Sequence, residues 1–95
     1  MLVETAASKL SELGHVTRLE IFRLLVKGGS AGLPVGEIQA ALGVPGSTLT
    51  HHIARLVSVG LVEQRREGRT LFCVPQYDEL DSLIQYLQEE CCVDG

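Results

Sequence analysis

The stretch from Leu42 to Leu61, LGVPGSTLTHHIARLVSVGL, predicts a tight turn followed by one amphipathic helix. Gly43 can close a preceding helix because glycine tolerates the left-handed conformation, and Pro45 prevents that helix from continuing. Ser47 and Thr48 carry hydroxyls that can cap the start of the new helix. An apolar face then follows at helical spacing, formed by Leu49, Ile53, Leu56 and Val57.

The opposite face of this helix is rich in hydrogen-bonding groups and almost uncharged. An ordinary solvated face carries Glu and Lys, whereas this one has neither, and its only formal charge is Arg55. Such a face suits a helix whose N-terminal half enters a DNA major groove, with the arginine near a phosphate. The alternative is a surface helix with accidental Ser, Thr and His. The candidate DNA contacts on this helix are Ser47, Thr48, Thr50, His51, His52 and Arg55.

A short helix is predicted just before the turn, from about Val35, because Ile38, Ala41 and Leu42 share one side. Two short helices joined by a turn of about three to four residues containing glycine are typical of a helix-turn-helix. An αα-corner in any all-helical domain would look the same, so the sequence that follows decides between them.

Gly60 is expected to end the long helix, and a basic β-hairpin is predicted directly after it. Leu61 and Val62 lead into one strand, Glu67-Gly68 is expected to form the turn, and the return strand alternates up to Pro75. Three arginines surround the tip, namely Arg65, Arg66 and Arg69. A helix-turn-helix followed by such a hairpin is a winged helix, whose tip can reach phosphate or the minor groove. The alternative is a solvated loop with scattered arginines.

Three further amphipathic helices are predicted outside this unit. The first ends at Gly14, the second runs from His15 to Lys27, and the last is capped by Asp78. Their apolar stripes are Val3, Ala6, Ala7, Leu10 and Leu13; Val16, Leu19, Phe22, Leu25 and Val26; and Leu80, Leu83, Ile84 and Leu87. The terminal stripes are too apolar for a small monomer to leave exposed, so a two-fold homodimer is expected. If the last helix continues, Cys91 lies on its stripe.

Length and composition predict one small domain spanning residues 1–95, with an aliphatic core, since 45% of the residues are hydrophobic and 4% aromatic. No apolar run is long enough to span a membrane, and no signal peptide is visible, so a cytoplasmic location is expected. There, thiols stay reduced, and three cysteines do not suggest a disulfide framework. Too small for a deep cleft and without a catalytic constellation, the chain is not expected to be an enzyme.

The net charge of −4 is unevenly distributed along the chain. Residues 46–76 carry four arginines and two glutamates, whereas residues 77–95 carry only acidic charges. Because screening limits electrostatic reach to about 10 Å, DNA senses the local patch more than the total. The distribution is compatible with DNA binding of modest affinity and strong salt dependence. A winged helix used only for protein contacts is the competing interpretation.

At this point the sequence resembles the ArsR/SmtB family of bacterial repressors over nearly its whole length. The matching segments are 13–25, 47–56, 60–62, 66–69 and 90–92. The resemblance implies a mostly helical winged helix-turn-helix in α-α-α-α-β-β-α order, with the first and last helices forming a homodimer interface. It also implies a repressor that binds a palindromic DNA operator until an inducer, often a metal or metalloid, releases it.

The family's sensing sites differ in how well they match. The third-helix cysteine site is absent, since residues 37–41 read EIQAA, and residues 77–90 contain no His for a zinc site on the last helix. Cys91 and Cys92 match the C-terminal cysteine type, which implies arsenite or antimonite as inducer and no permanent cofactor. Such ions usually take three sulfurs, so Cys73, a partner's thiol or an external thiol is expected to complete the site.

Two alternatives to this sensing role remain. One is a thiol-based redox switch, which would join chains or involve Cys73, because adjacent cysteines are too close for an ordinary disulfide. The other is an inducer-independent regulator in which Cys91 is a small buried hydrophobe and Cys92 an idle neighbour.

Overall fold

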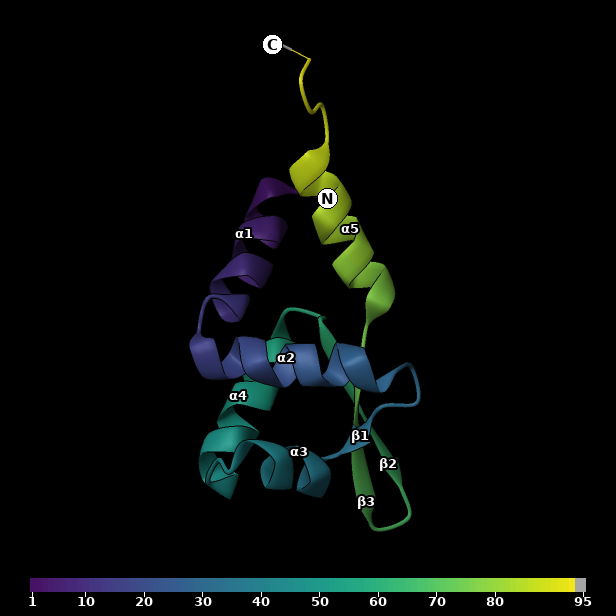
Figure 1. The fold of residues 1–95 in the computed structure, drawn as a ribbon. Coiled ribbons are helices and arrows are strands. Elements are labelled where there is room, and N and C mark those ends of the chain that lie inside the picture. The colour runs from purple at the N-terminus through teal and green to yellow at the C-terminus, as the bar shows by residue number, and fades with distance from the viewer. Residues whose placement is uncertain (94–95) are drawn as a thin grey trace.

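The computed structural model describes residues 1–93 and contains five helices and a three-stranded antiparallel sheet (Figure 1). The elements are α1 (Val3–Leu13), α2 (Val16–Gly28), β1 (Leu33–Pro34), α3 (Val35–Leu42), α4 (Gly46–Ser58), β2 (Val62–Glu67), β3 (Thr70–Pro75) and α5 (Tyr77–Gln88). This order confirms the predicted mostly helical winged helix-turn-helix, with the short strand β1 added to it. Among residues 1–93, no helix is long and apolar enough to cross a membrane.

Helix α2 lies across the middle of the molecule and separates two layers (Figure 1). On one side α1 and α5 diverge towards α2, with the start of α1 near the end of α5. On the other side lie α3, α4 and the sheet. The helix-turn-helix and the wing are therefore grouped at one end of the molecule, away from the C-terminal end of the described chain.

The core is aliphatic, as composition predicted, and α2 and α4 contribute most of it. Its buried residues are Ile21, Phe22, Leu25, Ile38, Leu49, Ile53, Leu56, Leu61, Val62 and Cys73. The predicted stripe of α2 was partly wrong, because Ile21 is buried whereas Val16 is 72% exposed. The helical period is correct, but it does not say which apolar side chains face the core.

The wing has the predicted strands with a turn one residue later than expected. Glu67 pairs with Thr70, so Gly68 and Arg69 form the two-residue loop, and Gly68 adopts a φ of +62°. A third strand, β1, was not predicted. It consists of Leu33 and Pro34, which pair with Cys73 and Phe72. A two-residue strand leaves no periodic signal in a sequence.

Both ends of α5 differ from the prediction. The helix starts at Tyr77 after Gln76, so Asp78 lies inside the first turn and does not cap it. The helix ends at Gln88, and Glu90 and Cys92 have φ values of +61° and +65°. Cys91 is therefore exposed beyond the helix and does not extend its apolar stripe.

Candidate nucleic-acid interface

The turn between α3 and α4 forms as the sequence predicts at Gly43. This residue adopts a left-handed φ of +64°, and its amide donates to the Gln39 carbonyl at 2.8 Å. Helix α4 then begins at Gly46, with Pro45 at the N-cap and no side chain capping the first amides. Ser47 and Thr48 thus lie inside the first turn and do not cap it, contrary to the prediction. The uncapped amides give this end of α4 a partial positive charge.

Helix α4 is fixed by its apolar face and presents polar side chains on the other. Leu49, Ile53 and Leu56 are almost fully buried. Ser47, Thr48, Thr50 and His51 are exposed near its N-terminal end, although the Thr50 hydroxyl already donates to the Gly46 carbonyl at 2.9 Å. The exposed hydrogen-bonding groups therefore gather on the half of α4 from which a recognition helix reads bases.

The structure separates His52 from the other predicted DNA contacts. Its side chain is only 6% exposed, and its ring centre lies 4.6 Å from that of His15, which caps α2. Burial lowers the pKa of His52, and the neighbouring His15, Arg18 and His51 lower it further. The expectation that His52 contacts DNA is corrected by this burial: its ring packs inside the protein against His15 at the start of α2.

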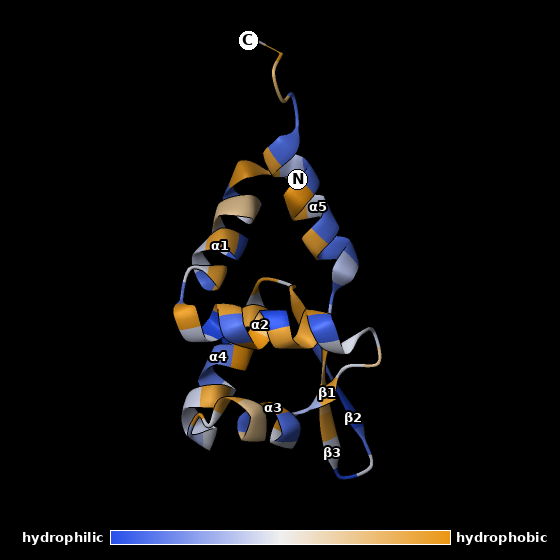
Figure 2. Cartoon of the chain, in the orientation of Figure 1, coloured by the Kyte–Doolittle hydropathy of each residue, from blue (hydrophilic) through white to orange (hydrophobic). Residues whose placement is uncertain are grey.

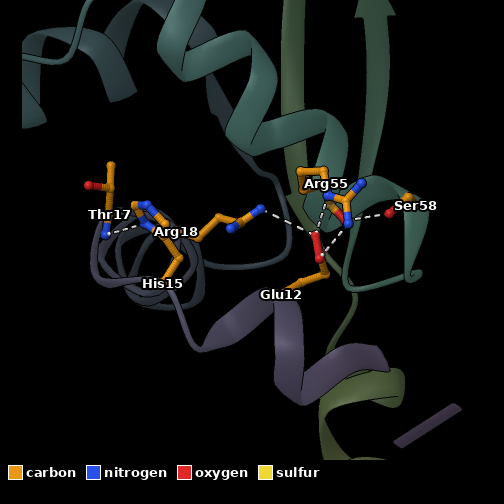
Figure 3. A network of polar contacts seen from close by, with 6 residues as sticks. All are labelled: Glu12, His15, Thr17, Arg18, Arg55 and Ser58. Atoms are coloured by element: carbon orange, nitrogen blue, oxygen red, sulfur yellow. Dashed lines mark hydrogen bonds and ion pairs between the residues drawn. The ribbon is translucent and has the colours of Figure 1, made fainter. Parts of the chain in front are cut away.

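The Arg55 side chain reaches Glu12 of α1 (Figure 3). Its Nε and Nη2 donate to the two carboxylate oxygens of Glu12 at 2.7 and 2.8 Å. These hydrogen bonds lower the pKa of Glu12 and raise that of Arg55. The guanidinium therefore joins α4 to α1, while the Arg55 side chain remains 51% exposed, and its contact with a phosphate stays a prediction.

The three wing arginines, Arg65, Arg66 and Arg69, are exposed on β2 and at the turn. Arg66 and Arg69 also border a shallow pocket with Pro34, Val35 and Gly36 at the start of α3. Among residues 1–93 these arginines form no ion pair, so their guanidinium groups are available for contact with a phosphate backbone. The wing and the exposed half of α4 together form the candidate interface.

The three cysteines do not come together. Cys73 is buried within the sheet, and burial raises the pKa of its thiol. Cys91 and Cys92 are exposed beyond α5, with their Sγ atoms 3.2 Å apart. Among residues 1–93 no group of three His, Cys, Asp or Glu is placed to hold a metal ion. The predicted third ligand, Cys73, is thus excluded within one chain by its place in the core.

Sequence reasoning missed Lys9 and Glu12, which α1 buries next to α4. Lys9 donates to the Val59 carbonyl and Glu12 accepts from Arg55 and Arg18. Their helical spacing placed them on the polar face of α1, and charged residues are usually solvated. The partner Arg55 lies 43 positions away in the sequence, so no local pattern reveals the pair.

A family model described as a helix-turn-helix domain matches residues 13–65. An uncharacterized HTH-type transcriptional regulator of Methanocaldococcus jannaschii is 34% identical over 86 residues, covering 90% of this chain and 94% of the relative. The structure of an ArsR-like transcriptional regulator from Rhodococcus sp. RHA1 superimposes with a TM-score of 0.79 at 27% identity, covering 90% of this chain and 77% of that one.

A further solved structure is the winged helix-turn-helix DNA-binding domain of Mb0332 from Mycobacterium bovis. This domain is described as homodimeric and as a possible ArsR-family regulator. It superimposes with a TM-score of 0.72 at 30% identity, covering 95% of this chain and 83% of that one. The matched model, the relative and the two structures agree with the geometry of α4 and the wing. The chain belongs to the ArsR family of winged helix-turn-helix proteins and is a DNA-binding transcriptional regulator.

Proposed function

We propose that this regulator is a homodimeric repressor that binds a palindromic DNA operator. The observation that carries the proposal is the set of exposed hydrogen-bonding groups at the start of α4, namely Ser47, Thr48 and His51, at the same end of the molecule as the wing (Figure 1). Base edges are read by hydrogen-bonding side chains, whereas arginines near a phosphate backbone supply affinity without sequence information. The start of α4 and the wing supply these two roles from the same end of the molecule.

Apolar side chains left exposed on the terminal helices support the homodimer. Val3 and Leu10 on α1 are 60% and 41% exposed, and Ile84 and Leu87 on α5 are 44% and 57% exposed. Figure 2 shows apolar segments along both helices. A second copy seated on this face would remove them from water, and a two-fold axis there would place two copies of α4 about one DNA turn apart. The similar Mb0332 domain, which is homodimeric, supports the same assembly.

The inducer that we propose is a thiophilic metalloid, As(III) or Sb(III), bound by Cys91 and Cys92. The two exposed thiols, 3.2 Å apart, present adjacent soft ligands to such an ion. Because Cys73 is buried in the sheet, the third sulfur would come from the partner subunit or from an external thiol. A redox switch between chains uses the same pair and is the second candidate.

The experiment that tests DNA recognition begins with selection of a binding sequence from a random duplex library. Operator and random DNA are then compared by competition for the wild type and for Ser47→Ala and His51→Ala. We expect each substitution to reduce discrimination by about 1–3 kcal/mol, as for a good base contact. Ser58→Ala is the matched control, because Ser58 lies at the far end of α4 and its hydroxyl donates to the Arg55 carbonyl.

Failure of the wild type to enrich any sequence would remove the proposal. A reporter gene placed behind the selected sequence then tests the sign of regulation. We expect the protein to lower expression; a rise would make it an activator that uses the same interface.

A further inference from the structure

Helix α1 buries two charged side chains, Lys9 and Glu12, against the C-terminal end of α4. Its buried residues are Ala6, Lys9 and Glu12, and Lys9 and Glu12 are only 4% and 6% exposed. The apolar Val3 and Leu10 remain exposed on the other side. Buried charges are costly unless they are paired, so the contacts of Lys9 and Glu12 must satisfy them.

Glu12 receives hydrogen bonds from two helices at once (Figure 3). Arg55 of α4 binds both of its carboxylate oxygens, at 2.7 and 2.8 Å, and Arg18 Nη1 of α2 lies 3.3 Å from Oε2. A bidentate arginine–carboxylate pair fixes the relative orientation of the two groups as well as their distance. One carboxylate on α1 thus sets the position of the last turn of α4.

Lys9 makes a second connection one turn earlier on α1. Its ammonium donates to the carbonyl of Val59, the C-cap residue of α4, and lies 3.2 Å from Glu79 Oε2 in the first turn of α5. The C-terminal end of α4 is therefore attached to both terminal helices. We call the set of Lys9, Glu12, Arg18 and Arg55 the α1–α4 junction.

A pocket borders this junction. Ala7, Ser8, Ser11 and Val59 border a pocket together with Glu12 and Arg55. Because mostly small side chains surround this pocket, we expect the polar contacts to fix the angle between α1 and α4. If α1 moves, it must either break these contacts or move the end of α4 with it.

We propose that Glu12 is a positioning residue for DNA recognition, and that the α1–α4 junction transmits movements of the terminal helices to α4. The proposal rests on the proposed role of α4 as the helix that reads DNA. It adds that sequence discrimination depends on an acidic side chain that touches no DNA. A negative charge on a DNA-binding domain would ordinarily only weaken binding, so the two roles predict opposite outcomes for its removal.

The test compares Glu12→Gln with Glu4→Gln, an exposed residue on the same helix with the same loss of charge. Operator and random-DNA binding are measured by competition, with thermal unfolding as a check on folding. In Glu12→Gln the released arginines should strengthen binding to random DNA and steepen its salt slope by about 1. Operator discrimination should fall roughly fivefold or more, in the range of intramolecular coupling between sites. Glu4→Gln should leave discrimination unchanged.

Two further variants keep the test decisive if Glu12→Gln unfolds. Arg55→Lys keeps the charge but loses the fork that binds both carboxylate oxygens, and Glu12→Asp keeps the charge but withdraws it by one methylene. Both should also lower discrimination. Unchanged discrimination in these variants, or an equal loss of operator and random binding with loss of folded protein, would overturn the proposal.

Hydrogen exchange of the free protein separates this proposal from the proposed function. Exchange of the amides of residues 55–59 should be faster in Glu12→Gln than in the wild type, and unchanged in Glu4→Gln. Should the wild type select no DNA sequence, the repressor proposal falls and this measurement still decides the junction. Equal exchange in the two variants would show that Glu12 does not hold the end of α4.

Discussion

At the scale of single residues, we expect His52 to make the folding stability of the protein sensitive to mild acid. The imidazole is 6% exposed, and its Nδ1 has no hydrogen-bond partner among residues 1–93. Burial, followed by the positive field of its neighbours, lowers its pKa below the ordinary value of 6.5. The unfolded chain therefore takes up a proton that the folded chain resists, and stability falls as the pH drops through about 6.5.

We expect urea unfolding of the wild type to occur at lower urea concentration at pH 5.5 than at pH 7.5. Glu12 does not interfere in this window, because its pKa is lowered from an ordinary value of 4.5, so its contribution to stability is lost only at more acid pH. His52→Leu removes the buried titrating group and should reduce the difference between the two pH values. His51→Gln, which changes an exposed imidazole, should retain it. An identical pH dependence in His52→Leu and wild type would contradict the prediction.

At the scale of elements, we expect the wing to supply affinity for DNA without discrimination between sequences. Arg66 near the end of β2 and Arg69 in the two-residue turn are exposed, beside the start of α3. Arg69→Ala should weaken binding to operator and random DNA alike and reduce the salt slope by about 1, because a phosphate contact releases counterions and reads no base. Arg23→Ala removes an exposed charge of α2 instead and serves as the control. If Arg69→Ala bound both DNAs as wild type does, the wing would not be a DNA contact.

The elements were largely predictable because their signals are local. Gly43, Pro45 and Pro75 mark boundaries that the structure keeps, and periodicity finds every helix. Which side of a helix is buried is less predictable, because it depends on packing partners elsewhere in the chain. Apolar Val16 is exposed, whereas charged Glu12 is buried, since Arg55 approaches it from α4. A non-local contact also buries His52 beside His15, and the face of α4 alone could not reveal it.

At the scale of the whole molecule, the exposed apolar faces of α1 and α5 predict that DNA binding requires a second copy. Ile84→Glu places a charge on a side chain that is 44% exposed in the single chain and that the proposed dimer would bury. We expect this variant to sediment as a folded monomer and to lose operator binding. Gln85→Glu adds the same charge at the neighbouring exposed position and should remain dimeric. A wild type that is monomeric at micromolar concentration would refute the dimer.

The proposed inducer site lies at the far end of the molecule from α4 and the wing (Figure 1). Release of DNA from there requires a ligand that prefers the form with low affinity for DNA, because equal binding to both forms shifts nothing. A coupling typical of allosteric sites would weaken operator binding roughly 5–150-fold. The path available within one chain runs along α5 to Glu79, then through Lys9 to the end of α4.

Cys91→Ser and Cys92→Ser should each keep operator binding and lose release by arsenite, since neither thiol lies near α4 or the wing. Cys73→Ala is the control, and it should keep both properties because the Cys73 thiol is buried in the sheet. Operator-bound protein is titrated separately with arsenite, Zn²⁺ and peroxide. If only peroxide releases the protein from the operator, the redox switch is favoured. If the double variant still leaves the operator at the wild-type arsenite concentration, the two thiols are not the sensor. Release would then have to act on α1 or α5 directly, through the same junction at Lys9 and Glu12.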